Sequence, residues 1–96
     1  MENWRQRMDP VERNEQDAAR YADAVVAALG AEWRTVPVVR TAKCVGITRI
    51  RKILARSSAD ALLGLVSQKL VSQELINIEG EIVYFEPALI ARFEAA

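Results

Sequence analysis

The stretch from Leu75 to Phe85 constrains the fold of this chain more than any other part of the sequence. Residues 75–78 and 82–85 are rich in β-branched and aromatic side chains, and only Glu79-Gly80-Glu81 separates them. Two such runs joined by a short turn that contains glycine predict a β-hairpin. The chain is therefore expected to combine helices with a small antiparallel β-element.

A long helix is predicted before this hairpin. Asp9 can cap it, Pro10 suits the first helical position, and Glu12 lies at the spacing of a capping box. Apolar residues then recur at helical spacing until Gly30, which is typical of a C-terminal cap. The pattern predicts one helix over residues 10–29.

Two shorter helices are predicted in the middle of the chain. In residues 48–56 Thr48 is the expected cap, and the apolar side chains lie opposite a stripe of basic ones. Ser57 and Asp60 have the spacing of a second capping box, which predicts a helix over residues 59–73.

The remaining segments are short. Residues 33–39 are β-prone, but Pro37 cannot donate a ladder hydrogen bond and limits them to a short edge strand. Residues 41–45 are expected to form a helical turn, and Pro87 to start a terminal helix. The predicted fold class is mainly α with a small β-hairpin (α+β), in the order helix, short edge strand, helix, helix, hairpin, helix.

This order is that of a winged helix, in which the helix before the hairpin reads DNA and the hairpin is the wing. Residues 70–91 resemble the end of the winged DNA-binding domain of Crp/Fnr-type bacterial regulators. The resemblance is carried by Leu75-Ile76, Gly80, Ile82-Val83, Glu86-Pro87 and Leu89, while Glu74 stands where that family commonly has glycine. The resemblance implies a winged helix-turn-helix fold and DNA binding.

Length and composition fit one domain. The chain has 96 residues, of which 51% are hydrophobic and 27% are charged, as in an ordinary globular domain. Residues 1–8 are expected to be a flexible N-terminal segment and residues 9–96 a single winged-helix domain. The sequence shows neither an apolar run long enough to span a membrane nor a signal-peptide pattern, so a cytoplasmic location is expected.

The sequence contains no histidine and one cysteine, Cys44. This excludes nucleophilic pairs of the Ser–His or Cys–His type and leaves no ligand set for a structural zinc site. We therefore expect no enzyme activity, no metal site and no cofactor.

The charges are unevenly distributed, although the net charge is zero. Residues 35–69 hold seven basic residues and one acidic residue, whereas residues 70–96 hold one basic and five acidic residues. Such a cationic segment predicts a phosphate-binding surface. The candidate phosphate contacts are Arg40, Lys43, Arg49, Arg51, Lys52, Arg56 and Lys69. The alternatives for these charges are a solvated helix face or ion pairs with the acidic first helix.

Further residues are candidates for the sequence-reading part of such a surface. Ser67 and Gln68 are expected on the outer side of helix 59–73, where they can bond to base edges in the major groove. The candidate wing consists of Glu79, Gly80 and Glu81. The winged-helix order favours helix 59–73 as the reading helix, and helix 48–56 is the alternative. Gly64 indicates either a close approach of DNA or another helix, or a packing role within the chain.

A homodimer is expected, because small DNA-binding domains commonly pair on two-fold symmetric sites. The candidate interface residues are Tyr21, Val26, Leu89 and Phe93. The alternative is that these side chains close the core of the monomer. Leu65 and Val71 lie off the apolar stripe of their helix, which also indicates burial against a second chain.

The sequence as a whole predicts a small DNA-binding protein, a transcriptional or replicon-maintenance regulator that contacts duplex DNA through a basic helix pair and a wing. The alternative is a winged-helix module for protein–protein interaction that binds no nucleic acid. The zero net charge and the acidic wing favour that alternative. An RNA-binding winged helix is a third alternative.

Overall fold

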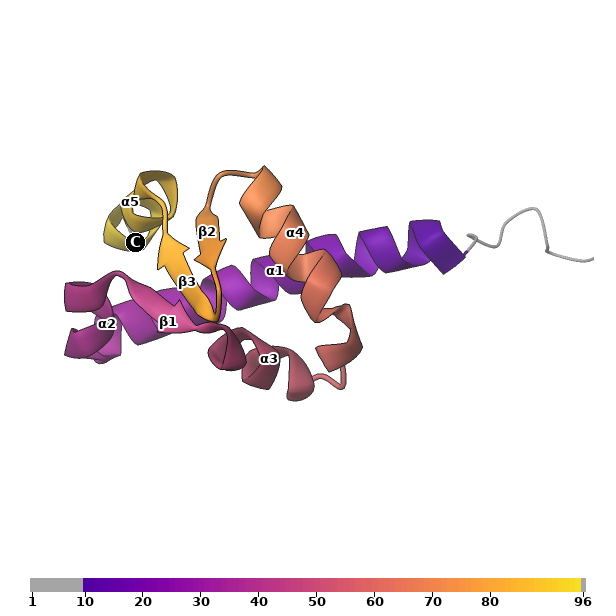
Figure 1. Cartoon of the computed structure of the whole chain (residues 1–96), viewed down its shortest axis with the longest axis horizontal. Helices are drawn as coiled ribbons and strands as arrows, with labels where there is room; N and C mark the ends of the chain where they lie inside the picture. The colour runs from indigo at the N-terminus through magenta and orange to yellow at the C-terminus, as the bar shows by residue number, and fades with distance from the viewer. Residues whose placement is uncertain (1–9, 96) are drawn as a thin grey trace, which may run out of the picture.

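The computed structural model describes residues 10–95, with side chains from residue 14 on. The elements in chain order are α1 (Pro10–Thr35), α2 (Pro37–Ala42), β1 (Cys44–Gly46), α3 (Ile47–Ala55), the 3₁₀ turn η2 (Asp60–Leu62), α4 (Leu63–Ser72), β2 (Ile76–Glu79), β3 (Ile82–Phe85) and α5 (Pro87–Ala95). This confirms the predicted fold class and order of elements (Figure 1). Residues 1–8 and the expected cap Asp9 lie outside the described residues. None of the described helices is long and apolar enough to span a membrane.

α1 continues past Gly30, where the sequence pattern places its end. Gly30 is buried, and a Cβ at this position would lie 3.3 Å from Cδ1 of Phe93 on α5. The missing side chain lets α5 approach α1 closely, so this glycine serves helix packing and not helix termination. The predicted boundary at residue 29 is therefore wrong. Figure 1 shows that the N-terminal turns of α1 extend beyond α4.

The segment 33–39, predicted as an edge strand, is helical. Its first residues complete α1, and Pro37 starts α2, because a proline at the first helical position has a suitable φ and no N–H that needs a partner. α2 ends at Lys43, whose left-handed φ of 56° turns the chain. β1 follows at once and is an edge strand of the sheet. Of residues 41–45, which were expected to form a helical turn, only the first two are helical, and the last two belong to β1.

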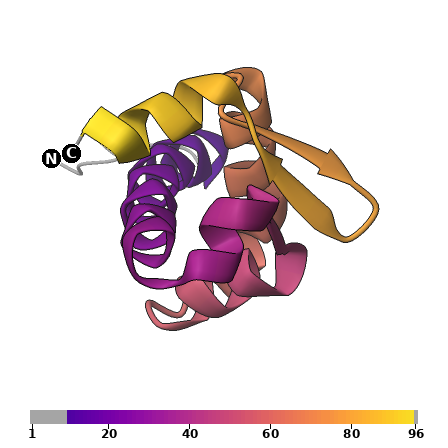
Figure 2. The ribbon, with the colours of Figure 1, turned by 90° about the vertical axis from the view of Figure 1, so that its left-hand side faces the viewer.

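β1 and β2 both pair antiparallel with β3, which gives the strand order β1-β3-β2. Val83 and Phe85 of β3 face the core, whereas Ile82 and Tyr84 lie on the exposed side, as the two-residue period of a strand requires. Gly80 takes a φ of 62° in the turn between β2 and β3. The predicted hairpin is thus confirmed, and Figure 2 shows it projecting from the helical body.

α3 and α4 lie close to the predicted helices 48–56 and 59–73, but their caps differ from the prediction. Neither Thr48 nor the capping-box spacing supplies a side-chain cap. Ser58 has a φ of 54°, and its N–H and the following N–H bond back into the last turn of α3. Ser57 and Ser58 therefore end α3 in a Schellman motif and do not open α4.

α4 ends in the same way. The N–H of Leu75 bonds to the carbonyl of Leu70 (3.1 Å), and Glu74 has a φ of 59°. The left-handed conformation is strained for a residue with a Cβ, and glycine adopts it without this strain. The backbone thus favours glycine at this position, although this chain has glutamate there.

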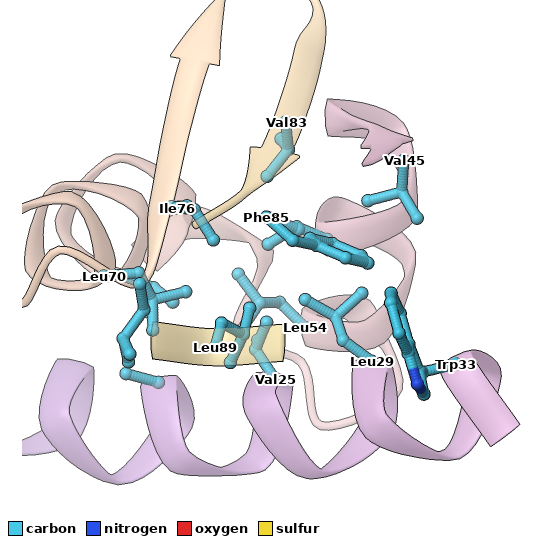
Figure 3. Close-up of a cluster of buried hydrophobic side chains, with 14 of the residues drawn as sticks. Val25, Leu29, Trp33, Val45, Leu54, Leu70, Ile76, Val83, Phe85 and Leu89 are labelled. Atoms are coloured by element: carbon cyan, nitrogen blue, oxygen red, sulfur yellow. The ribbon is translucent and has the colours of Figure 1, made fainter. Parts of the chain in front are cut away.

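The core lies between α1 and the layer formed by the sheet and the other helices (Figure 3). Val25, Leu29 and Trp33 project from α1 into this core. Trp33 also forms an aromatic cluster with Phe85 and Phe93, with ring centroids 5.6 to 6.1 Å apart. The cluster joins α1, β3 and α5, so the C-terminal helix is part of the folded core.

Candidate nucleic-acid interface

The outward side of α3 is cationic. Ile50 and Leu54 are buried and hold the helix against the core, so the opposite side points to solvent. Four exposed positive residues occupy that side and the C-cap of the helix, and together they are the α3 cationic face: Arg49, Arg51, Lys52 and Arg56. No acidic residue occurs in the sequence between Glu32 and Asp60.

One member of the α3 cationic face pairs with an acid. Nε of Arg49 lies 3.0 Å from Oε1 of Glu32 on α1, so the expected alternative of an ion pair with the first helix holds for this residue. The other oxygen of Glu32, Oε2, is buried and has no hydrogen-bond partner. Within residues 14–95 the structure shows no acidic partner for the other three cations. Their charge therefore remains available to a ligand.

An open hollow adjoins the α3 cationic face. It is lined by Thr48, Arg49 and Lys52 of α3 and by Val39, Cys44, Val45 and Gly46 of α2 and β1. Gly46 is the N-cap of α3 and supplies no side-chain acceptor to the first helical amides. The positive end of the helix dipole, Arg49 and Lys52 thus meet at one place. The first amide of α3 is bonded to the carbonyl of Glu81 and Arg49 is paired with Glu32, so Lys52 is the cation of this hollow that is left to hold an anion.

The other three predicted phosphate contacts lie outside the α3 cationic face. Nη1 of Arg40 donates to the carbonyls of Trp33 (2.8 Å) and Arg34 (3.0 Å), and so caps the C-terminal end of α1. Lys43 is exposed at the end of α2, and Lys69 is half-buried on α4. The structure therefore gathers four of the seven candidates on one helix.

α4 presents a different surface. Its exposed residues, which together are the α4 face, are Gly64, Leu65, Gln68, Val71 and Ser72, and none of them is charged. Gln68 is thus exposed as predicted, and it borders a groove between α4 and α1. Ser67 is only 8% exposed and its Oγ has no hydrogen-bond partner among the described residues. The buried side of α4 includes Ser67 beside Val66, so this hydroxyl is not placed to reach a base edge.

The hairpin tip carries the predicted wing residues. Glu79 and Glu81 are exposed, and Oε2 of Glu79 accepts a hydrogen bond from Nδ2 of Asn77 (3.2 Å). The carbonyl of Glu81 accepts the first N–H of α3 (2.8 Å), which places the wing next to the α3 N-terminus. Two carboxylates at the tip repel phosphates, so the tip itself is poorly suited to a nucleic-acid backbone.

Two of the predicted dimer residues belong to the core. Leu89 and Phe93 are buried against α1 and are not available as an interface. Tyr21 and Val26 are half-buried and pack against the same core, and the guanidinium of Arg20 lies 5.0 Å from the Tyr21 ring centroid. For Leu89 and Phe93 the monomer-core alternative therefore holds, because a chain of this size needs its large apolar side chains inside.

A groove between α1 and α4, which no sequence pattern predicted, is a further feature of the surface. Two adjoining hollows form it, and both are lined by Glu15 of α1 and Lys69 of α4. The one sequence signal for it is Leu65, which lies off the apolar stripe of its helix and lines the groove.

Comparison with known proteins adds no further information on the site. No family model, no curated protein and no solved structure matches the chain. Among the described residues no group of three or more His, Cys, Asp or Glu side chains is arranged to hold a metal ion. The α3 cationic face and the α4 face are therefore the candidate functional surfaces of the chain.

Proposed function

We propose that this chain is a small DNA-binding protein that contacts the phosphates of duplex DNA through the α3 cationic face. The observation that carries the proposal is four exposed positive charges on one helix, of which only Arg49 pairs with an acid among the described residues. Lys and Arg side chains displace the counterions condensed on DNA, and the release of these ions favours binding. Transcriptional or replicon-maintenance regulation is the role that we propose for this binding.

We further propose that the fold belongs to the winged helix-turn-helix superfamily. Support comes from the succession of α3, α4 and the β2–β3 hairpin, with β1 on the other side of β3. The hairpin is then the wing. Because its tip bonds to the first amide of α3, a ligand held at the start of α3 also lies near the wing.

The distribution of charge favours α3 over α4 as the helix that first engages the DNA backbone. Phosphate contacts position a protein on the duplex, whereas contacts to base edges select the sequence. The α4 face offers Gln68 and Ser72 as hydrogen-bonding side chains and has no charge with which to hold a phosphate. Base recognition by Gln68 would therefore depend on the phosphate contacts made by α3.

Titration of a fluorescent DNA duplex at several salt concentrations tests the proposal. If Arg51, Lys52 and Arg56 each contact a phosphate, the slope of log affinity against log salt is roughly −3, from about −0.9 per contact. Lys52→Ala should make this slope less steep by about 1. Arg92→Ala on α5 is the matched control, since it removes one exposed positive charge outside the α3 cationic face. Absence of binding at about 50 mM salt, or equal effects of the two variants, would contradict the proposal.

An exposed apolar surface favours a second candidate function, a protein-interaction module that binds no nucleic acid. Ile82 and Tyr84 on the outer side of the sheet are 38% and 40% exposed, and Val38 on α2 is 68% exposed. Neighbouring exposed apolar side chains, such as Ile82 and Tyr84 on one side of β3, commonly mark protein contacts, and the acidic wing tip adjoins Ile82. If the chain leaves duplex DNA free at low salt, and Tyr84→Ser leaves the fold unchanged, this second candidate becomes the better one.

A further inference from the structure

The groove between α1 and α4 has the composition of a protein contact. Its lining combines short and branched apolar side chains with one acid, one base and three polar residues: Ala18, Ala19, Leu65, Glu15, Lys69, Gln16, Gln68 and Ser72. Leu65 is 38% exposed, although it is a large aliphatic residue on a helix that is otherwise anchored in the core. Nothing within the described residues covers this leucine fully.

Gly64 lies next to Leu65 on the α4 face. Glycine is a poor helix former, and Gly64 is in the first turn of α4 without a positive φ that would require it. A Cβ built at Gly64 meets no atom within 4 Å, so packing inside the chain does not explain the glycine either. Among the described residues the structure thus shows no packing role for Gly64, and the open space beside it would let a helix from outside the chain approach closely.

The groove carries one acidic and one basic side chain, so the grooves of two copies can be complementary in charge. Glu15 on the α1 side and Lys69 on the α4 side line the same two hollows, yet they form no ion pair within 4.0 Å of each other. In a two-fold symmetric contact whose axis runs along the groove, the α1 side of each copy faces the α4 side of the other, which brings each acid to a base. The zero net charge of the chain adds no long-range repulsion between copies.

We propose that the α1/α4 groove is the interface between two copies of this chain, related by a two-fold axis. Glu15 of each copy faces Lys69 of the other, the two Leu65 side chains are covered together, and Gly64 allows the helices to approach closely. This interface differs from one built on α5. It involves no residue of the α3 cationic face, so its test is independent of the proposed phosphate contacts. Because Gln68 lines the groove, a dimer formed here would remove Gln68 from base recognition.

Exchange of the two charges tests the proposal. The protein alone should sediment at twice its 10.7 kDa at micromolar concentration. Glu15→Lys alone and Lys69→Glu alone each place like charges together at two symmetric positions, and each should raise the dimer Kd at least about tenfold. A mixture of the two variants restores opposite charges at both positions. The two variants should therefore form a heterodimer more tightly than either variant forms a homodimer.

Substitution of Gly64 is a second test, in which the stability of the monomer and the affinity of the dimer should change in opposite directions. Gly64→Ala should leave the monomer as stable as before or more stable, because alanine favours the helix and meets no atom of its own chain. The added methyl groups nevertheless separate the paired helices, and the dimer Kd should rise at least about tenfold. Thermal unfolding and sedimentation of the same sample separate the two effects.

Three outcomes would overturn the proposal. The first is a mass of 10.7 kDa for the unmodified chain at the highest soluble concentration. The second is a dimer that withstands both charge reversals, which would place the interface elsewhere. The third is a mixture of Glu15→Lys and Lys69→Glu chains that associates no better than each alone, since the two charges would then not meet across the interface.

Discussion

α3 and α4 follow each other in the chain and are nearly equal in length, at 9 and 10 residues. Each helix buries two large aliphatic side chains completely or almost completely, and both contribute to the same core. Their exposed sides have little in common. The α3 cationic face holds four positive residues, whereas the α4 face has none and includes Leu65 and Val71.

The exposed side of each helix can be compared with what the stability of the fold requires of it. Like charges three or four residues apart on a helix, such as Lys52 and Arg56, repel and destabilise it by about 0.2–0.5 kcal/mol per pair. Apart from Arg49, which pairs with Glu32, the members of the α3 cationic face bring the fold no gain, and the DNA proposed above would account for these three charges. The same reasoning applies to Gly64 and Leu65 on α4, because packing among the described residues does not account for them and the second copy proposed above would use them.

The largest expected effect is the loss of DNA affinity when α3 loses two unpaired charges. Lys52→Ala combined with Arg56→Ala should weaken duplex binding about 60-fold at 0.1 M salt, since each lost phosphate contact accounts for about 8-fold under these conditions. Both side chains are exposed, so circular dichroism should show an unchanged fold. Fluorescence anisotropy with the duplex measures the change.

The matched variant on the other helix is Gln68→Ala combined with Ser72→Ala, which removes two exposed polar side chains from the α4 face without altering charge. It should leave affinity for mixed-sequence duplex nearly unchanged. A comparable loss of DNA affinity in both double variants would contradict the proposal that α3, and not α4, makes the phosphate contacts.

The next effect is on stability and concerns Arg49, the one member of the α3 cationic face that also serves the fold. Arg49→Ala should lower the free energy of unfolding by about 1–2 kcal/mol, because Glu32 keeps a partly buried carboxylate and loses its ion-pair partner. Arg51→Ala removes an unpaired charge from the same helix and should change stability by less than about 0.5 kcal/mol. Urea unfolding compares the two variants, and equal values would show that the ion pair contributes nothing.

Local patterns predicted the hairpin and the positions of α3, α4 and α5, because turn glycine, helical spacing and the proline at a helix start act over a few residues. Gly30 and Pro37 misled the prediction for a physical reason. A glycine in a helix can mean either an end or a close contact, and only the position of Phe93 on a distant helix decides between them. A proline after a helix can likewise start another one.

The candidate site shows the same limit. The stripe of cations on α3 follows from helical periodicity alone, so the sequence was sufficient to predict it. The burial of Ser67 and the ion pair between Arg49 and Glu32 depend on how α1 lies across the other helices. The spacing of residues within one helix does not show how α1 lies across the other helices. The burial of Leu89 and Phe93 depends on this arrangement too.

The smallest expected effects come from substitutions just after the C-terminal ends of α3 and α4. The two helix ends have the same backbone conformation, although the exposed sides of the two helices differ. Ser58 follows the end of α3 and Glu74 follows the end of α4, and both residues have a left-handed φ, of 54° and 59°. Ser58→Gly and Glu74→Gly should each raise the free energy of unfolding by about 0.5–1 kcal/mol. The relief of left-handed strain is about 1–2 kcal/mol, and the greater freedom of glycine in the unfolded chain offsets part of it.

The gain from Glu74→Gly should exceed the gain from Ser58→Gly by a few tenths of a kcal/mol. Glu74 places a negative charge at the negative end of the α4 dipole, and its removal relieves that repulsion as well, whereas Ser58 is uncharged. Glu74→Gln is the control, since it removes the charge and keeps the left-handed strain, so it should show only the smaller increment. Thermal unfolding at low salt resolves these steps, and high salt should diminish the charge increment alone. A loss of stability in either glycine variant would mean that contacts of the Ser58 or Glu74 side chain outweigh the backbone strain at that helix end.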